Sequence, residues 1–565
     1  MSIYETRGHQ MYPVLDAAHV ETARRFASGP ARTFRPGEAV FAVGERNLPA
    51  WLVLGGAIEV VRRDGLGHET PITVARPGQF TGEVSQLGGR GSLAAGRAGP
   101  EGCTALPIDA PSLRALVVAS AELGEIVMRA LILRRVGLLE GGGSGAVLVG
   151  RPGAPDLVRL QGFLSRNGYP STVLDASADA EGRELVERLG VLPDELPLMS
   201  CPSGTVLKRP LDSEAGACLG ITPELDPKKV YDVAVVGAGP AGLATAVYAA
   251  SEGLSVLVLD QRAIGGQAGA SSRIENYLGF PTGISGQALA GRAFIQSQKF
   301  GAELAIPLEV ARLDCEERDR HPREPWRLVL TDGSAVRARA VVIASGARYR
   351  RPDIRELATF EGAGVSYWAS PVEAKLCEGE EIALVGGGNS AGQAVVFLAP
   401  RVKRLSLIIR GESLASSMSR YLIDRIAALP NVEIHTRTEV TALEGDRAQG
   451  LTGAVFRDGS TGATRTCPMR HLFLFIGADP NAGWLKGCVE LDEHGFVLTG
   501  LPSSGASRAA RPALPLETSR RGVFAIGDVR AGSTKRVAAA VGEGAAVVAQ
   551  VHGFLAEESP AANTE

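Results

Sequence analysis

The sequence predicts a multidomain protein: a β-roll plus helix, a smaller α/β block, and two dinucleotide-binding domains with a Rossmann-like three-layer ββα fold. The chain has 565 residues, enough for three or four domains of ordinary size. Two glycine-rich turns, 237–242 and 386–391, each follow an apolar strand-like segment and precede a helical one. Residues 30–140 instead alternate short apolar runs with glycine turns before they become helical. These three observations set the fold class.

The composition and charge of the chain argue against nucleic-acid-binding and membrane proteins. The chain is 45% hydrophobic and 21% charged, so each block can bury a core. A net charge of -3 argues against a large nucleic-acid surface. The N-terminus has no apolar run of signal-peptide type, and no uninterrupted apolar stretch reaches the roughly 20 residues of a membrane helix. We therefore expect a cytoplasmic protein with no nucleic-acid and no membrane partner.

The cysteines are seven, an odd number scattered from Cys103 to Cys488. Such spacing predicts neither a disulfide framework nor a metal site, and it is typical of a protein from a reducing compartment. Two segments look like joints between blocks: the glycine-rich 141–145, which has the composition of a flexible linker, and a mixed segment at about 211–229. They predict blocks at 1–140, 146–210 and 230–556, with a frayed polar tail from Glu557.

The first block reads as strands at 41–45, 51–54 and 57–61, followed by a helix at 121–139. It resembles the cyclic nucleotide-binding domain of catabolite-activator-type regulators, most closely in the Gly-Gln-Phe-Thr-Gly-Glu run of 78–83. The resemblance implies that the glutamate holds a ribose hydroxyl and that an arginine shortly after it pairs with the cyclic phosphate. If strand 96–98 sets the register, Ser92 stands where that family has its phosphate-binding arginine, and Arg90 lies two residues before that position. The bidentate contact of an arginine with the phosphate is then lost. The residues concerned are Gly82, Glu83, Arg90 and Ser92.

Two interpretations of this block stay open. It binds a nucleotide effector through those residues, or it is a sensor that has lost its ligand and serves dimerisation or packing.

The second block predicts strands at 146–149 and 171–175, helices at 156–167 and 180–190, and a hairpin turn at 202–204. This order resembles a glutaredoxin or thioredoxin domain. That family places Cys-x-x-Cys at the start of the first helix, where this chain has Ala154-Pro155-Asp156-Leu157. Pro197 stands at the family's cis-proline. Cys201, just beyond it, is expected to be a small packed residue.

The first glycine-rich turn follows the apolar strand 230–236 and opens the helix 243–250. Gly237 is expected to make the tight turn, Gly239 to let the backbone approach a pyrophosphate, and Gly242 to allow close helix–strand packing. The next strand, 255–259, ends at Asp260. A carboxylate there can accept a ribose hydroxyl and would repel a 2′-phosphate, which favours FAD or NAD.

The second turn follows strand 381–385, and the next strand, 405–409, ends at Arg410. An arginine at this strand end pairs with a 2′-phosphate, which favours NADP. Glu412 stands close by in sequence, so a solvated Arg–Glu pair is the alternative.

Residues 230–556 resemble thioredoxin reductases, in the stretches 264–267, 274–277, 279–281, 522–529 and 535–538. The resemblance implies a discontinuous FAD domain, 230–346 and 470–556, with an NAD(P)H domain, 347–469, inserted. The cofactors implied are FAD and NADPH, with NADH as the alternative, and the assembly implied is a homodimer. The FAD residues expected are Gly237, Gly239, Ala241, Gly242, Asp260, Gln261, Gly266, Gln267, Asn276, Gly527, Asp528, Lys535, Arg536, Val537 and Ala538. The NAD(P)H residues expected are Gly386, Gly388, Asn389, Ser390, Ala391 and Arg410.

One departure from that family bears on function. Its Cys-x-x-Cys follows a Gly-Val-Ser-Tyr stretch, present here at 364–367, but 368–371 reads Trp-Ala-Ser-Pro. The nearest thiol, Cys377, is expected to be structural, and no catalytic residue can be named. We expect an NAD(P)H-dependent flavin reductase whose electron acceptor is unknown. The alternatives are a disulfide reductase that uses distant thiols such as Cys201, and a non-catalytic redox or nucleotide sensor.

Overall fold

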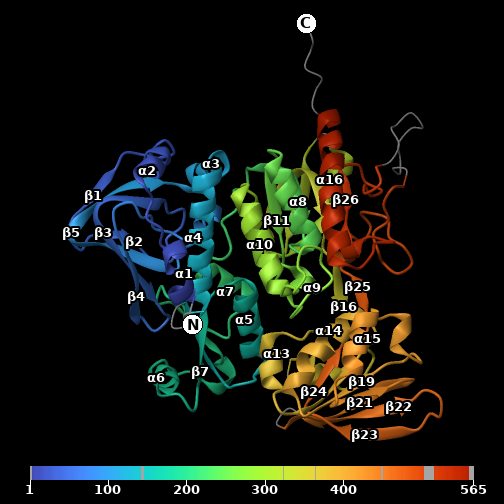
Figure 1. The fold of residues 1–565 in the computed structure, drawn as a ribbon. Coiled ribbons are helices and arrows are strands. Elements are labelled where there is room, and N and C mark those ends of the chain that lie inside the picture. Colours follow the sequence, from blue (N-terminus) through green and yellow to red (C-terminus); the bar gives the residue numbers. More distant parts are fainter. Residues whose placement is uncertain are drawn as a thin grey trace.

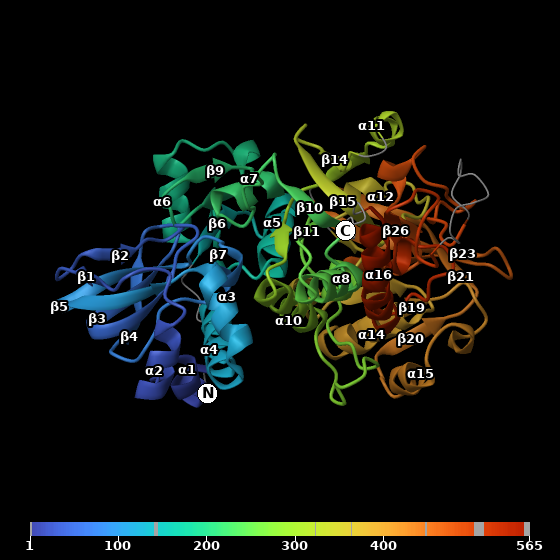
Figure 2. The same ribbon diagram turned by 90° about the horizontal axis from the view of Figure 1, so that it is seen from above.

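The computed structural model describes residues 3–140, 145–321, 324–362, 364–446, 449–501 and 514–558. Figure 1 shows the blue β-roll at one side, a small green-blue α/β block beside it, and two larger α/β units coloured green to red. The view from above in Figure 2 shows the same division, with α5 of the small block beside α10 of the first larger unit. Most of the expected joint at 141–145, and the tail beyond Glu558, lie outside the described residues.

The β-roll has the strand order β1-β5-β3-β4, with β2 paired to β5. Where two strands were expected at 51–54 and 57–61, one strand of 14 residues runs through both, because register shifts around Gly55 and Gly56 bend it without ending it. The strand expected at 41–45 is shorter and ends at Phe41. The elements are α1 (Ile3–Met11), α2 (Ala17–Arg24), β1 (Arg32–Phe34), β2 (Ala39–Phe41), β3 (Ala50–Arg63), β4 (Glu69–Ala75), η1 (Val84–Gly88), β5 (Ala94–Ile108), α3 (Ala110–Ala119) and α4 (Ala121–Glu140).

The middle block is a four-stranded sheet of order β7-β6-β8-β9, in which β6 is fully buried. The peptide bond between Leu196 and Pro197 is cis, as the resemblance implied. The expected joint at 211–229 instead contains a helix, α7, whose Ala215 is buried in one core with Leu148 of β6. The elements are β6 (Ala146–Gly150), α5 (Pro155–Arg166), β7 (Ser171–Asp175), α6 (Ala180–Arg188), β8 (Leu198–Ser200), β9 (Val206–Lys208) and α7 (Asp212–Cys218).

The first dinucleotide sheet has the order β12-β11-β10-β15-β14-β13, with β26 paired in parallel to β15. The sheet is parallel except at β13 and β14, and β10, β11 and β15 carry apolar runs at 233–236, 256–259 and 340–343, as expected of parallel strands covered on both faces. Its strands are β10 (Val230–Val236), β11 (Val256–Leu259), β12 (Glu303–Ala305), β13 (Val310–Leu313), β14 (Trp326–Leu330), β15 (Ala335–Ile343) and β26 (Val523–Ala525). Its helices are α8 (Pro240–Ser251), α9 (Gly266–Gly269), α10 (Gly286–Lys299), α11 (Cys315–Arg320) and α16 (Val537–Glu558).

The second dinucleotide sheet is all-parallel, in the order β17-β24-β18-β19-β20. A two-stranded sheet, β16-β25, joins it to the first, and an antiparallel sheet, β21-β22-β23, follows β20. The elements are β16 (Ala347–Tyr349), α12 (Leu357–Phe360), β17 (Val365–Ser366), α13 (Pro371–Leu376), β18 (Glu381–Val385), α14 (Asn389–Leu398), β19 (Arg404–Ile408), α15 (Arg420–Ala427), β20 (Val432–His435), β21 (Thr438–Asp446), β22 (Gly450–Asp458), β23 (Thr464–Pro468), β24 (His471–Leu474) and β25 (Ala478–Pro480).

One described helix, α16, is long and apolar enough to cross a membrane by length and composition alone. It lies along α8, and its Val547, Val551 and Phe554 are buried in the core of the first sheet (Figure 1). This burial is typical of a core helix.

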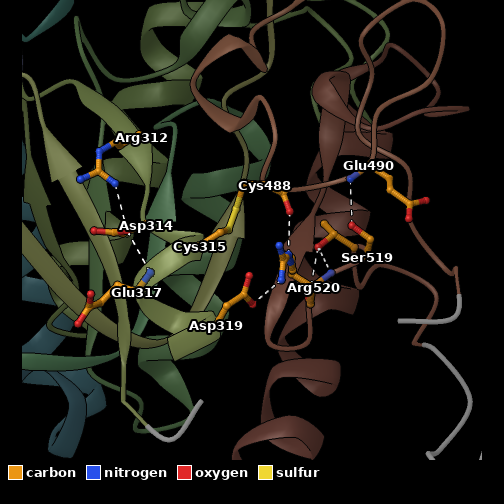
Figure 3. Close-up of a disulfide and its surroundings, with 10 residues drawn as sticks. Arg312, Asp314, Cys315, Glu317, Asp319, Cys488, Glu490, Ser519 and Arg520 are labelled. Atoms are coloured by element: carbon orange, nitrogen blue, oxygen red, sulfur yellow. Dashed lines mark hydrogen bonds and ion pairs between the residues drawn. A yellow bond between two sulfur atoms is a disulfide. The ribbon is translucent and has the colours of Figure 1, made fainter. Parts of the chain in front are cut away.

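The expectation of no disulfides is wrong. Cys201 pairs with Cys218, which ties the end of α7 to the segment after β8, and Cys315 pairs with Cys488. The second bond joins the two chain segments that build the first dinucleotide sheet region, across a sequence separation of 173 residues (Figure 3). Spacing in sequence hid both pairs, because only folding brings these cysteines together.

Beside the second disulfide, Arg520 reinforces the same junction. Its guanidinium donates to the carbonyl oxygen of Cys488 at 2.9 Å and to the carboxylate of Asp319 at 2.6 Å (Figure 3). The three remaining cysteines, Cys103, Cys377 and Cys467, are free thiols.

Candidate functional site

The first glycine-rich turn connects β10 to α8 and admits no side chain at two positions. Gly237 has a φ of +115°, and a Cβ there would lie 2.2 Å from the carbonyl oxygen of Ala344. A Cβ on Gly242 would lie 1.9 Å from the carbonyl oxygen of Gly237. Gly239 caps α8 without a side-chain hydrogen bond, which leaves the first backbone N–H groups of the helix available for an anion. The turn therefore has the form that a pyrophosphate requires.

Asp260 follows β11, at the expected strand end. Its carboxylate accepts hydrogen bonds from the backbone N–H groups of Ala238 at 2.9 Å, Arg262 at 2.8 Å and Ala263 at 3.1 Å. It thus braces the glycine turn as well as standing where a ribose is expected. Since a carboxylate has about four acceptor positions, one remains for a hydroxyl.

The second expected flavin motif, 527–528, belongs to the C-terminal part of the chain and lies against the same glycine turn. A Cβ on Gly527 would lie 3.0 Å from the Cβ of Ala241, and its N–H donates to Glu543 at 2.6 Å. Asp528 follows it and is half-buried; burial raises the pKa of its carboxyl, while Lys535 opposes that shift. The structure therefore brings residues 237–242 and 527–528 together, although nearly 300 positions separate them in sequence.

The other expected FAD residues surround this junction with differing exposure. Gln267 donates from its amide to the carbonyl oxygen of Ala347, which starts the linker strand β16. Lys535 donates to the carbonyl oxygen of Asp528 at 2.6 Å, just before α16 begins. Gly266 opens α9. Gln261, Asn276, Arg536 and Ala538 are exposed, and Val537 is half-buried.

A cavity of about 310 Å³ adjoins this junction between α8, α10 and the start of α16. Most of its lining is apolar, and Tyr277 and Phe280 stack at its edge with ring centroids 5.9 Å apart. Gly265 and Val537 also line it, so it borders the expected flavin residues.

The second glycine-rich turn, between β18 and α14, repeats the first. Gly386 has a φ of +148°, and a Cβ there would lie 2.5 Å from the carbonyl oxygen of Phe475. Gly388 caps α14 and has open space beside it. The Oδ1 atom of Asn389 accepts from the N–H of Ser419 at 2.7 Å, and Ser417 donates to the carbonyl oxygen of Gly387 at 2.8 Å. Ser390 and Ala391 continue the first turn of α14.

Arg410 is exposed at the end of β19, as expected. The structure pairs Glu412 with Arg437, which comes from the segment before β21, at 2.6 Å. The alternative of an Arg410–Glu412 pair is therefore not what forms. Sequence analysis missed Arg437 because it lies 25 residues beyond Glu412 in the chain.

The segment 368–371, which follows β17, forms the capped start of α13. The carboxylate of Glu373 accepts from the indole N–H of Trp368 at 2.9 Å and from the N–H of Ser370 at 3.0 Å. Arg262, from the first sheet's turn, lies over the Trp368 ring at 5.7 Å. Cys377 ends α13, fully buried, and burial raises the pKa of its thiol to about 11. A thiol in this state is a poor nucleophile at neutral pH.

In the first block, Glu83 and Arg90 each contact a helix. Glu83 lies 3.7 Å from the guanidinium of Arg135 in α4, and Arg90 stacks on the ring of Phe294 in α10 at 4.7 Å. Burial lowers the pKa of Arg90 to about 10. Ser92 is buried and donates to the carbonyl oxygen of Ala94 at 2.8 Å.

The arginine and phenylalanine partners in α4 and α10 are further residues that sequence reasoning missed, because neither lies near its partner in sequence. The pair of Glu83 with Arg135 lies within the first block, whereas Arg90 on Phe294 forms part of the contact with the first dinucleotide unit, where Gly88 of η1 also lies against Gln298 of α10.

Two glycine turns at the carboxyl ends of parallel strands, joined through one linker sheet, are typical of oxidoreductases with two dinucleotide sites. Comparison with known proteins gives the family. Residues 231–544 match the family described as pyridine nucleotide-disulphide oxidoreductase, to which this chain belongs. Residues 31–120 match the cyclic nucleotide-binding domain.

Among individual relatives, the thioredoxin reductase of Streptomyces clavuligerus is 31% identical over 58% of this chain and 94% of its own length. The thioredoxin reductase of Mycolicibacterium smegmatis is 32% identical, over 58% of this chain and 98% of its own length. Among solved structures, the thioredoxin reductase of Lactococcus lactis in its FR conformation is 25% identical, with a TM-score of 0.52 over 58% of this chain and 99% of that one. The protein is thus a thioredoxin-reductase-like flavoprotein oxidoreductase with an N-terminal cyclic nucleotide-binding domain, and its family uses FAD and NADPH.

Proposed function

We propose that the protein is an NADPH-dependent flavin reductase that passes hydride-derived electrons to an acceptor without a local dithiol. One observation carries this proposal: the position of the relatives' expected Cys-x-x-Cys reads Trp-Ala-Ser-Pro at 368–371, and no two cysteines in the chain stand three residues apart. Disulfide relay needs a thiolate near the flavin and a second thiol to resolve the mixed disulfide.

In this proposal FAD lies on the first turn and NADPH on the second. The N-terminus of α8 and the N–H groups after Gly239 hold the pyrophosphate, Asp260 accepts from the adenine ribose, and Asp528 accepts from the ribityl chain. Asn389 and the N-terminus of α14 hold the NADPH pyrophosphate, and Arg410 pairs with its 2′-phosphate. The bound flavin supplies the hydride and electron chemistry, and the protein supplies orientation and a water-poor surrounding.

The domain division that fits this proposal is 1–140, 146–210, 230–346 with 470–556, and 347–469. The acceptor class is a small aromatic molecule of quinone type, because the 310 Å³ cavity beside Gly265 and Val537 is mainly apolar.

The test is anaerobic reduction of the purified protein. We expect a yellow protein whose flavin absorbance bleaches with NADPH and returns when a quinone or ferricyanide is added. A protein that binds FAD but is not reduced by NADPH or NADH would favour the non-catalytic sensor instead.

A disulfide reductase is the second candidate, and the Cys201–Cys218 pair is the observation that favours it. Cys201 lies in the middle block and is fully buried, and Cys218 ends α7, which packs on that block. Thioredoxin reduction that disappears in Cys201→Ser would support this candidate over the first.

Arg410 gives a prediction on nucleotide preference. One charge-assisted contact is worth about 1.5–3 kcal/mol, so Arg410→Ala is expected to raise the KM for NADPH roughly ten- to a hundredfold and to leave that for NADH almost unchanged. Arg404→Ala is the matched control, an exposed arginine at the opposite end of β19. If the wild type already prefers NADH, the assignment of Arg410 is wrong.

A further inference from the structure

The end of helix α5, in the middle block, reaches the first dinucleotide site. Its last residue, Arg166, donates from Nη2 to the carbonyl oxygen of Gly266 at 2.9 Å. The next residue, Asn167, donates to the carbonyl oxygen of Arg262 at 3.0 Å. From the other side, Gln287 in α10 donates to the carbonyl oxygen of Ser165 at 2.7 Å. Residues 165–167 are therefore held against the loop that follows Asp260.

Gly266, the partner of Arg166, packs directly on the glycine turn. A Cβ on Gly266 would lie 3.1 Å from the Cα of Gly239, and the N–H of Gly265 donates to the carbonyl oxygen of Ala238 at 2.7 Å. The residue that accepts from Arg166 therefore packs against Gly239, the N-cap of α8.

The guanidinium has donor capacity that the protein does not use. The Nε atom of Arg166 is buried and has no acceptor among the residues that the structure describes. Burial lowers the pKa of Arg166, and the neighbouring Arg262 lowers it further, while Asp260, Tyr349 and Glu373 act in the opposite direction. The carboxylate of Asp260 is already engaged by three backbone N–H groups.

Arg166 is partly buried as a residue, but its Nε–H is shielded from water, and such an unused donor is costly unless an acceptor pairs with it. Here it lies beside a second guanidinium and a helix N-terminus, so three positive features converge on one place. An anion is the partner that balances them, and the dinucleotide phosphates of the first site carry that charge.

We propose that Arg166 is a cofactor-binding residue: the middle block contributes a guanidinium to the phosphates of FAD on the first glycine turn. The proposal rests on FAD occupying that turn, as in the proposed function. It gives the middle block a role that needs no cysteine, because the block completes the flavin site through the end of α5.

The test measures FAD affinity of protein freed of its flavin, by quenching of flavin fluorescence, in wild type and Arg166→Gln. Glutamine removes the charge, and because its amide is two bonds shorter than the Nη2 atom of arginine it also loses the contact with Gly266. A control that loses only a docking contact is therefore needed beside it. We expect the Kd of Arg166→Gln for FAD to rise about ten- to a hundredfold. Arg166→Lys, which restores the charge without the planar fork, is expected to recover part of the affinity. The melting temperature of flavin-free Arg166→Gln is expected to match that of a variant that loses another single contact between the same two blocks.

Gln287→Ala is the control, since it removes a contact between the same two blocks without touching the site. It is expected to bind FAD within about twofold of wild type. Equal FAD affinity in Arg166→Gln and wild type would overturn the proposal, and so would an equal loss in Gln287→Ala, which would mean that α5 acts only by docking. Should Arg166→Gln not fold, Arg166→Met provides the neutral variant. A wild-type protein that binds no FAD would instead refute the proposed function, so the two failures are distinguishable.

Discussion

Gly242→Ala is expected to give a colourless protein. The new Cβ would stand 1.9 Å from the carbonyl oxygen of Gly237 and 3.2 Å from Val235. Both obstacles belong to β10 or the turn itself, so the N-terminus of α8 must move away from the strand and from the phosphates. We expect the affinity for FAD to fall at least about hundredfold, on the order of 3 kcal/mol. The measurement is the ratio of flavin to protein absorbance after purification, with a fluorescence titration of added FAD.

Gly291→Ala is the matched control, because a Cβ at this position in α10 meets nothing within 4 Å. Since alanine is the better helix former by up to about 1 kcal/mol, this variant should keep its FAD and its stability. A Gly242→Ala protein with a full complement of FAD would contradict the assignment of the first turn.

The Cys315–Cys488 disulfide is expected to make a large contribution to stability. It closes a loop with a sequence separation of 173 residues, which includes the whole second dinucleotide sheet. By closing such a long loop, the crosslink lowers the conformational entropy of the unfolded chain and raises the free energy of unfolding by about 3–5 kcal/mol. The Cys315→Ala/Cys488→Ala protein should therefore unfold at markedly lower denaturant concentration than the oxidised wild type, by an amount that a reductant reproduces in the wild type.

Cys201→Ala/Cys218→Ala is the comparison variant, because its pair closes a separation of only 17 residues and should cost less. A thiol count checks both bonds directly. Denatured protein without reductant should label at three cysteines, Cys103, Cys377 and Cys467. Labelling at all seven would mean that neither disulfide forms.

What the sequence could predict was local. Both glycine turns, the strands that precede them and Asp260 at its strand end follow from patterns that span fewer than about 35 residues. The helix expected at 121–139 appears as α4 for the same reason. Hydrophobic spacing in the middle block likewise predicted α5 within one residue of its ends.

What it missed depends on contacts between distant segments. The Glu412–Arg437 pair and both disulfides form only after folding. The contact of Arg166 with Gly266 crosses 100 residues and two blocks, and nothing about an arginine at the end of a helix predicts it. Mixed composition predicts a joint at 211–229, but capping by Glu214 and the burial of Ala215 make its first part, 212–218, a helix.

The central claim, electron transfer from NADPH through flavin without a dithiol, is tested most directly by comparing acceptors before and after alkylation of the NADPH-reduced protein, in which a catalytic disulfide such as Cys201–Cys218 would be open to the reagent. We expect NADPH-dependent reduction of a quinone or ferricyanide, which need only access to the reduced flavin, and this activity should survive alkylation largely intact. Reduction of thioredoxin or of a small aromatic disulfide should not exceed slow non-specific leakage. Rapid thioredoxin reduction that alkylation abolishes would contradict the claim.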